Sequence, residues 1–146
     1  MNVRVILSRK GADVVTIQRQ ATVTEALQVL ADHNIGALVV CNDERTDVAG
    51  ILSERDIVRR LSRSGTETMQ LIVEDVMTAD VLTCDPEATA DEVMQVMTTH
   101  RARHLPVMED GRLAGIVSIG DVVKSRIDDL ETQTQSMQEY ISGSAY

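Results

Sequence analysis

The sequence predicts an α+β protein in which two similar copies pack as a pseudo-twofold pair, with a further helix at the C-terminal end. Residues 22–30 (TVTEALQVL) align with residues 89–97 (TADEVMQVM), 67 positions further on. Residues 49–60 (AGILSERDIVRR) align with residues 114–125 (AGIVSIGDVVKS), 65 positions further on. Two copies, rather than three or more, indicate a paired module. Because one copy of about fifty residues buries too small a fraction of its surface to be stable alone, the two are expected to pack together.

The elements of each copy follow in the order strand, helix, strand, strand, helix. Short apolar runs at 14–17 and 81–83 predict the first strand. Thr22 and Thr89 are each followed three residues later by a glutamate, which is the pattern of a helix-capping box. Apolar residues then recur at the spacing of one buried helix face. They are Val23, Ala26, Leu27 and Leu30 in the first copy and Ala90, Val93, Met94 and Met97 in the second.

Two strands joined by a hairpin come next in each copy. They are predicted at 37–41 and 48–53 in the first copy and at 105–108 and 113–118 in the second. The turn between them is two residues longer in the first copy (42–47) than in the second (109–112), which explains why the offset between the copies changes from 67 to 65. A loop that varies in length while its flanks keep register is typical of the protein surface.

A second helix begins at Ser53 in the first copy and at Ser118 in the second. Small and polar residues at 62–66 end the first of these helices, and residues 71–77 then predict a short helix that leads into the second copy. We therefore assign 1–62 to the first copy with its N-terminal segment, 63–77 to a linker with a short helix, 78–125 to the second copy, and 126–146 to a C-terminal helix and tail.

The helix that begins at Ser118 is expected to continue well beyond the second copy. Apolar residues recur there at spacings of four and three, in a heptad-like stripe with one polar member. The stripe consists of Val123, Ile127, Leu130, Thr134, Met137 and Ile141. It is too short to predict a coiled coil by itself, so we expect it to dock on the body of the chain or on a dimer partner. Tyr140 lies beside it and, with Tyr146, is one of the only two aromatic residues.

The composition excludes several classes of protein. The chain has 146 residues, of which 43% are apolar and 25% charged, and its formal net charge is −9. It has no run of eighteen apolar residues, so no membrane span is expected, and its first ten residues do not have the pattern of a signal peptide. Two cysteines fit a reducing compartment, which predicts a cytoplasmic protein. The acidic balance disfavours nucleic-acid binding, although Arg55, Arg59, Arg60 and Arg63 form a local basic group.

No pattern in the sequence predicts catalysis or metal binding. The glycine-rich phosphate loops and the nucleophile elbow are absent. Cys41 and Cys84 do not occupy equivalent repeat positions, and neither is part of a CxxC pair. His100 and His104 have the spacing of a metal pair, but Arg101 follows His100 where a zinc-protease helix has glutamate, and no further ligands are near. We therefore expect no enzyme, no metal and no catalytic cofactor.

The two strand-to-helix junctions, 50–56 and 115–121, are the strongest candidates for a site. In each of them a serine is followed three residues later by an aspartate. One interpretation is a capping box that only stabilises the helix. The other is a ligand site, since a helix N-terminus attracts phosphate and a carboxylate accepts hydrogen bonds from a ribose diol. The residues by themselves favour neither interpretation.

The segments GILSERDIV and GIVSIGDVV, together with MTADVLTCDPEAT and RARHLPVMEDG, resemble a tandem pair of CBS domains, also called a Bateman module, of the stand-alone bacterial type. The likeness runs from about Lys10 to Lys124. It implies a homodimer that binds an adenosine nucleotide such as AMP, ADP, ATP or NAD, or S-adenosylmethionine, in clefts between the two sheets. It also implies action on a separate regulated protein, whose identity the sequence does not give.

The resemblance assigns roles to residues of both junctions. It implies that Asp56 and Asp121 hold the ribose hydroxyls, and that Ser53 and Ser118 contact ribose or phosphate. Thr78, which Val81 follows, corresponds to the threonine that contacts the base region. Four aliphatic residues are expected to hold the base: Val81 together with Val14, Ile35 and Ala102.

The same resemblance makes the two clefts unequal. Arg103 and His104, just before the Leu105–Pro106 step, correspond to residues that meet the phosphates. Their counterparts in the first copy, Gly36 and Ala37, carry no charge. Gly11 is the first-copy equivalent of Thr78 and has no hydroxyl, so its neighbour Lys10 becomes the candidate phosphate contact. The second-copy equivalent of Arg55 is Gly120, which has no charge. All of these differences between the copies are differences in residue type at equivalent positions of the sequence. We predict that the clefts differ in ligand or affinity, or that one stays empty.

The functional prediction is a regulatory nucleotide-binding module that senses energy or redox state and acts on a partner protein without catalysis. The alternative is a ligand-free scaffold for dimerisation or interaction, which would use the C-terminal stripe.

Overall fold

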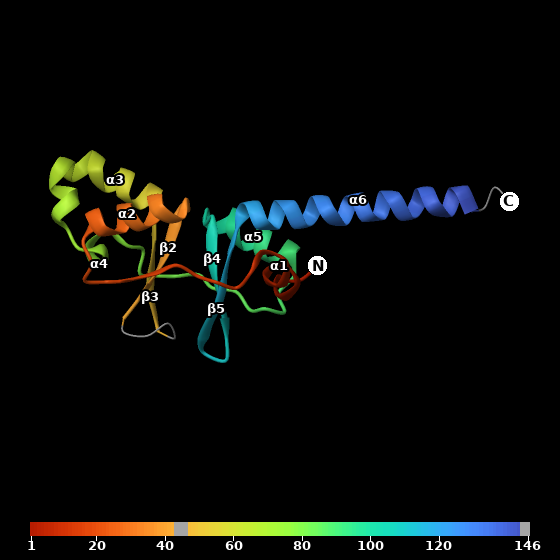
Figure 1. Ribbon diagram of the computed structural model, residues 1–146, viewed down its shortest axis with the longest axis horizontal. Coiled ribbons are helices and arrows are strands. Elements are labelled where there is room, and N and C mark those ends of the chain that lie inside the picture. The colour runs from red at the N-terminus through yellow and green to blue at the C-terminus, as the bar shows by residue number, and fades with distance from the viewer. Residues whose placement is uncertain (43–46, 144–146) are drawn as a thin grey trace.

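Two small sheets lie next to one another in the computed structural model, with α2 and α3 beside the first sheet and α5 and the start of α6 beside the second (Figure 1). The structure describes residues 1–42 and 47–143, so the predicted turn residues 43–46 and Tyr146 lie outside the described residues. The helices are α1 (Val3–Lys10), α2 (Val23–His33), α3 (Glu54–Ser64), α4 (Val73–Val76), α5 (Ala90–His100) and α6 (Ile119–Gly143), with a 3₁₀ helix at Gly65–Gln70. The strands are β1 (Thr16–Gln18), β2 (Ala37–Cys41), β3 (Val48–Ser53), β4 (His104–Glu109) and β5 (Arg112–Ser118).

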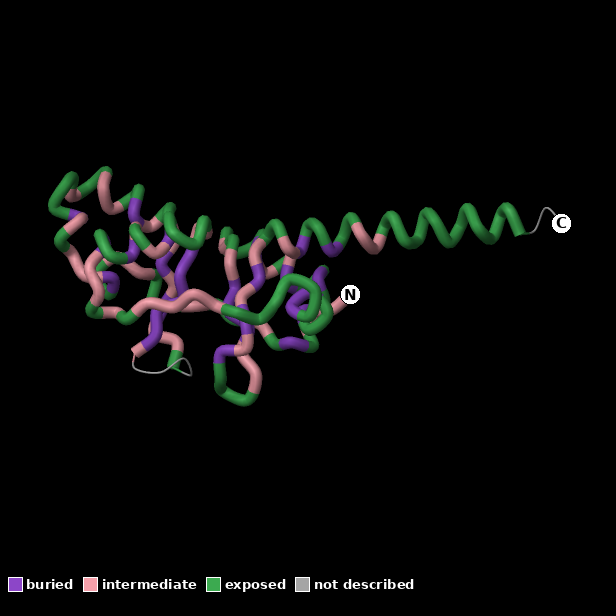
Figure 2. The backbone as a smooth tube through the Cα atoms, in the orientation of Figure 1, coloured by how far each residue is buried: buried purple, intermediate pink, exposed green. Residues whose placement is uncertain are grey.

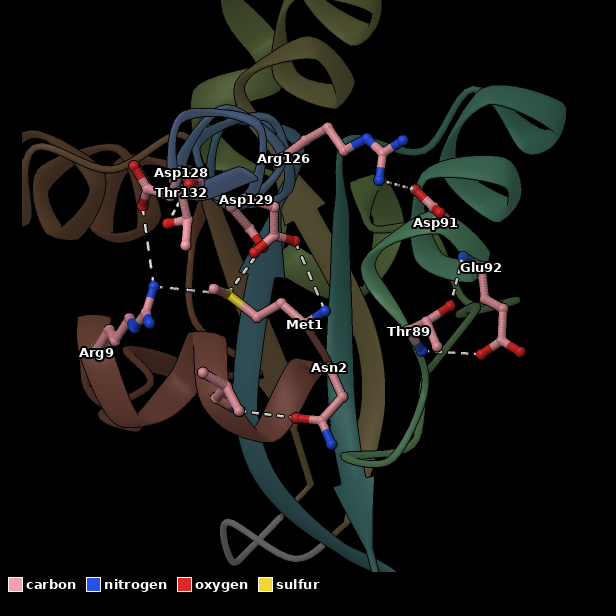
Figure 3. Close-up of polar contacts among 12 residues, drawn as sticks. Met1, Asn2, Arg9, Thr89, Asp91, Glu92, Arg126, Asp128, Asp129 and Thr132 are labelled. Atoms are coloured by element: carbon pink, nitrogen blue, oxygen red, sulfur yellow. Dashed lines mark hydrogen bonds and ion pairs between the residues drawn. The ribbon is translucent and has the colours of Figure 1, made fainter. Parts of the chain in front are cut away.

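The predicted α+β pair is confirmed, and the two copies match in detail. β2 pairs antiparallel with β3, and β4 pairs antiparallel with β5. Each ladder has an irregularity after the same repeat position, Val40 in the first copy and Val107 in the second. Thr22 and Thr89 both form the reciprocal hydrogen bonds of a capping box, as predicted, and Figure 3 shows the bonds of Thr89 with Glu92.

The first strand of the second copy, predicted at 81–83, is wrong. Only Cys84 forms a bridge there, parallel to Val107, whereas its counterpart Ile17 lies in a three-residue strand parallel to β2. Cys84 donates its N–H to the carbonyl of Pro106 and accepts from the N–H of Met108. The next ladder bonds would need N–H groups from Pro86 and Pro106, and proline has none. The chain has two prolines, and they confine this pairing to one residue.

Helix α1 was not predicted, although its sequence carries the signals of a helix. The side chain of Asn2 accepts a hydrogen bond from the Val5 N–H, and Gly11 ends the helix at φ 100°. Val3, Ile6 and Leu7 form its buried face and pack into the core of the second copy, among Val93, Val107 and Val122 and their neighbours. The helix that precedes the first copy therefore stabilises the second.

The linker that leads into the second copy packs, conversely, on the first copy. The predicted helix at 71–77 is a single turn, α4, and its Val73 packs into the core of the first copy, beside Val23 and Leu52. A third apolar cluster joins the two sheets and contains Val39, Cys41 and Leu113. The two copies thus exchange their leading segments and share a core, which fixes how the strand-to-helix junctions face each other.

The predicted C-terminal helix is confirmed. Figure 1 shows α6 extending away from the body, and Figure 2 shows that its burial is confined to the end that meets the body. Val122 and Ser125 are its buried residues. Beyond Leu130 every described residue of α6 is exposed, so the expected docking on this chain's own body does not occur there.

Candidate functional site

A cleft of about 480 Å³ lies where the two copies meet. Four segments line it: Gly36 just before β2, the strand-to-helix junction around Ser53, the lead-in segment between Thr78 and Leu82, and residues 100–104, which join α5 to β4. The first two belong to the first copy and the last to the second. A ligand in this cleft would therefore contact both copies at once.

Asp56 stands in the first turn of α3 and lines this cleft. Its Oδ2 accepts hydrogen bonds from the backbone N–H and the hydroxyl of Ser53, at 2.9 and 3.0 Å. Its Oδ1 accepts one long bond, 3.3 Å, from the hydroxyl of Thr78. Since an ionised carboxylate has about four acceptor positions, the Oδ1 side keeps capacity for a further donor. The capping role and a ligand role are thus compatible in the same side chain.

Thr78 is held in place by the strand next to it. Its N–H donates to the carbonyl of Ile51 at 2.9 Å, and its carbonyl accepts from the Ile51 N–H at 3.0 Å. Gly50, the preceding residue of β3, makes room for this approach. A Cβ added at Gly50 would lie 2.7 Å from the Thr78 carbonyl oxygen and 2.7 Å from the sulfur of Met77. The glycine of the junction therefore positions the threonine beside Asp56.

The second junction has the same capping bonds but a different partner. Asp121 Oδ2 accepts from the Ser118 N–H at 2.8 Å and from the Lys10 ammonium at 2.6 Å, and Lys10 also donates to the carbonyl of Ile116. Burial raises the pKa of the Asp121 carboxyl, but the hydrogen bonds from Lys10 and Ser118 and the charge of Lys10 outweigh it and hold this pKa below its usual range. Thus a cation contacts Asp121 where a neutral hydroxyl contacts Asp56.

Four arginines line the cleft around Asp56. Arg55 and Arg59 come from α3, one turn apart, and Arg101 and Arg103 come from the loop before β4. Among the described residues, none of these four side chains forms an ion pair or a hydrogen bond within the chain. Asp56, Glu54 and Asp80 also line the cleft. Four guanidinium groups against three carboxylates leave the lining of this cleft with a positive balance of charge, which can attract an anion.

His104 lies between the two junctions, half-buried at the start of β4. A Cβ at Gly36 would meet its ring at 3.9 Å and the Glu54 carboxyl at 3.8 Å. Burial lowers the pKa of His104, and the nearby Lys10 and Arg103 lower it further against the opposing carboxylates of Asp121 and Glu54. His104 is therefore a neutral hydrogen-bonding group at neutral pH, not a fixed positive charge.

This environment predicts a dependence of stability on pH. In the unfolded chain the histidine pKa is 6.5, and in the folded chain it is lower. Below pH 6.5 the unfolded state therefore binds more protons, and the free energy of unfolding falls as the pH falls. Urea unfolding at pH 7.5 and 5.5 should show a smaller loss for His104→Gln than for the wild type. A comparison at pH 8, where the imidazole is neutral in both states, isolates the packing cost of the substitution. Equal losses in the two proteins between pH 7.5 and 5.5 would contradict this prediction.

Nine of the residues assigned by the resemblance line this cleft together. They are Gly36, Ser53, Arg55, Asp56, Thr78, Val81, Ala102, Arg103 and His104. Of the four aliphatic residues expected at the base, Val81 and Ala102 are in the cleft. Val14 packs in the cluster between the sheets and Ile35 in the core of the first copy, so neither lines it.

The remaining predicted residues lie at or near the other junction or in the strands. Lys10 meets Asp121, and Ser118 caps α6. Gly120 is in the first turn of α6, where an added Cβ would meet only the Ser118 hydroxyl, at 3.7 Å. Ala37 and Pro106 are buried in β2 and β4, and neither lines the cleft around Asp56.

Sequence reasoning missed several residues of the cleft. Arg59 was noted only as part of a basic group, although it follows Arg55 by one helical turn and so faces the same side. Arg101 was not assigned a role, although its repeat position is equivalent to Asn34. Both of these residues end their helices in the left-handed conformation, at φ 53° and 51°. That equivalence is a signal that the loops 100–104 and 33–37 have the same course.

Other chemistry receives no support from the described residues. No group of three or more histidine, cysteine or acidic side chains is placed there to hold a metal ion. Burial raises the pKa of the Cys84 thiol to about 11, which makes it a poor nucleophile. None of the described helices is both long enough and apolar enough to cross a membrane.

We compared the chain with known protein families and with related proteins. The chain matches the family model of the CBS domain twice, over residues 5–63 and 73–128. The mitochondrial CBS domain-containing protein CBSX3 of Arabidopsis thaliana is 38% identical over 125 residues, which are 84% of this chain and 61% of the plant protein. The chain thus spans less than two thirds of that relative's length.

Solved structures show the same fold. The CBS-domain containing protein ATU1752 from Agrobacterium tumefaciens superimposes with a TM-score of 0.84 at 45% identity, over 86% of this chain and 99% of that one. The CBS domain pair of protein MJ0100, solved in complex with 5′-methylthioadenosine and S-adenosyl-L-methionine, gives a TM-score of 0.77 at 26% identity, over 88% of this chain and 98% of that one.

Proposed function

This chain belongs to the CBS domain family, and from that membership we propose that it is a regulatory module that binds an adenosine nucleotide and acts on a partner protein without catalysis. The proposed ligand is AMP, ADP, ATP or a nucleotide of the NAD type, bound in the cleft around Asp56. The proposed setting is the cytoplasm, and the proposed assembly is a homodimer. CBS pairs are regulatory modules, and the structure of MJ0100 holds adenosine compounds.

The observation that carries the proposal is the group of four arginines without partners in the described part of the chain. Like charges that line one cleft repel one another, and a chain with a net charge of −9 has ample carboxylates with which to pair them. Their isolation is explained if the countercharge arrives with the ligand. Since arginine binds phosphate in a bidentate way, a ligand with one or more phosphates is favoured over a neutral nucleoside.

The other contacts of a nucleotide have candidates in the same cleft. The open side of the Asp56 carboxylate, next to the Thr78 hydroxyl, suits the two hydroxyls of a ribose. Ile51, Val81 and Leu82 provide an aliphatic wall on which a purine can pack without an aromatic partner. The phosphates would then extend toward Arg55 and Arg103. A site assembled from both copies also gives a route to regulation, because a ligand that binds one arrangement of the copies better than another shifts the equilibrium between them.

Calorimetric titration tests the proposal. We expect ATP, ADP or AMP to bind at least about tenfold more tightly than 5′-methylthioadenosine, which has no phosphate, because charged hydrogen bonds contribute about 1.5–3 kcal/mol each. The affinity should fall as the salt concentration rises, since salt screens the arginines. Equal binding of the neutral compound would contradict the assignment of the arginines to phosphate.

A thermal shift experiment separates this function from that of a ligand-free scaffold. A nucleotide that binds only the folded state raises the melting temperature by mass action, and about 2.7 kcal/mol of stabilisation is expected at a hundred times the dissociation constant. Adenosine nucleotides at millimolar concentration should therefore raise the melting temperature by several degrees. No shift with any of them would favour the scaffold, which would rely on the exposed stripe of α6.

A further inference from the structure

Helix α6 has a face that belongs to the body of the chain. Val122 and Ser125 are buried against the second copy. Further along, the carboxylates of Asp128 and Asp129 meet the Arg9 guanidinium at 4.0 Å and the Met1 amino group at 3.7 Å (Figure 3). These contacts attach roughly the first three turns of α6, and they account for all of its buried residues.

A second face of α6 is apolar and does not meet the body. Val123, Ile127 and Leu130 are 45–51% exposed, and Met137 is 65% exposed. Together with Thr134 they follow one another at spacings of four and three residues, so they stay on one side of the helix. At 100° per residue this stripe is turned roughly 120° from the face that packs on the body. The docked and exposed faces are therefore different surfaces of one helix.

The projecting half of α6 has few internal contacts that stabilise it as a helix. Residues 131–143 are rich in threonine, serine and glutamine, and isolated helices of this length are marginal in water. The hydroxyls of Thr132 and Thr134 donate to the carbonyls of Asp128 and Leu130, a type of bond that tends to bend a helix. The Gln135–Glu139 bond is long, at 3.4 Å. Little within this segment stabilises it.

The charges beside the stripe indicate what covers it. When two helices pair in parallel through a heptad stripe, a residue on one flank faces the residue five positions later on the other flank of the second helix. Arg126 and Glu131 have this relation, and so do Gln133 and Gln138. A parallel pair of copies would therefore form two Arg126–Glu131 ion pairs and would place no like charges opposite one another. Arg126 is free to move to such a contact, since its present partner Asp91 is 3.6 Å away on an exposed surface.

We propose that the stripe Val123–Met137 of α6 pairs in parallel and in register with the same stripe of a second copy of this chain. The body-facing side of each helix stays in contact with its own second copy, so the two bodies lie on the outside of the pair. Thr134, whose hydroxyl donates to the Leu130 carbonyl of its own helix, is the polar member of the apolar seam and would face its own counterpart. This proposal does not depend on the nucleotide site.

Charge reversal tests the pairing directly by sedimentation equilibrium. Arg126→Glu and Glu131→Arg should each weaken the dimer by at least about fivefold, because each places like charges across both contacts. The double variant should restore the wild-type affinity to within about twofold. A monomeric wild type, single variants with unchanged affinity, or a double variant no better than the singles would overturn the proposal.

Cysteine cross-linking provides a test that is insensitive to other dimer contacts. Met137→Cys should form a disulfide dimer rapidly, because in a parallel in-register pair this residue faces its own counterpart. Ser136→Cys, which is turned away from the stripe, is the matched control and should not. Failure of Met137→Cys to cross-link in a dimeric protein, or equal cross-linking of the control, would overturn the parallel arrangement.

Discussion

Replacement of Asp56 by alanine is expected to weaken ATP binding by at least about tenfold. The variant loses the carboxylate that can accept hydrogen bonds from the ribose, and hydrogen bonds to charged groups contribute about 1.5–3 kcal/mol. It also loses the bond to Thr78 and the capping bonds to Ser53. Calorimetric titration of ATP into the purified variant measures the effect.

Asp121→Ala is the matched control for this substitution. It removes the same type of capping bond, from the Ser118 N–H, and so carries a comparable cost to its helix of about 1 kcal/mol. Its carboxylate, however, is already paired with Lys10. We expect ATP binding in the cleft around Asp56 to change by less than about threefold. A larger loss for Asp121→Ala than for Asp56→Ala would contradict the assignment of the nucleotide to the arginine-lined cleft.

Substitution of Gly50 by alanine is expected to damage both stability and binding. The added Cβ would lie 2.7 Å from the carbonyl oxygen of Thr78, so the backbone of this lead-in segment must move. Forcing atoms into a packed region costs about 1–3 kcal/mol. Because Thr78 is the neighbour of the Asp56 carboxylate, the affinity for ATP should fall as well. Urea unfolding and calorimetry on the same preparation measure both effects.

Gly115→Ala tests whether this effect is local. Gly115 is the repeat counterpart of Gly50, but its added Cβ would meet the side-chain methyl groups of Leu7 at 2.8 Å rather than a backbone atom. A side chain can adjust where a backbone cannot, so the loss of stability should be smaller and ATP binding should be unchanged. If the two glycine variants behaved alike, the positioning of Thr78 by Gly50 would lose its support.

Most of the fold could be predicted because each signal occurs twice. The capping boxes at Thr22 and Thr89 and the hairpin strands are predicted from local patterns, and the structure contains both capping boxes. The exception at 81–83 arises from Pro86 and Pro106, which are far apart in sequence and act together only once β4 lies beside Cys84. The residues at 81–83, considered without β4, gave no reason to expect that the strand would be interrupted.

The site was only partly predictable, because part of it depends on long-range packing. The sequence pointed to Asp56, Thr78 and Arg103, each carried by a recognisable motif, and the structure brings all three to one cleft. It did not show that α1 would cross to the second copy. The contact of Lys10 with Asp121 follows from that crossing alone, and it makes the two junctions chemically unequal.

A crystal structure of the protein grown with a mixture of AMP, ATP and NAD would show directly which cleft holds a nucleotide and how. We expect an adenosine nucleotide in the cleft between the copies, with its ribose hydroxyls on the Asp56 carboxylate and its phosphates among Arg55, Arg101 and Arg103. A nucleotide bound only at Asp121, phosphates directed away from the arginines, or an empty cleft at millimolar nucleotide would contradict this expectation.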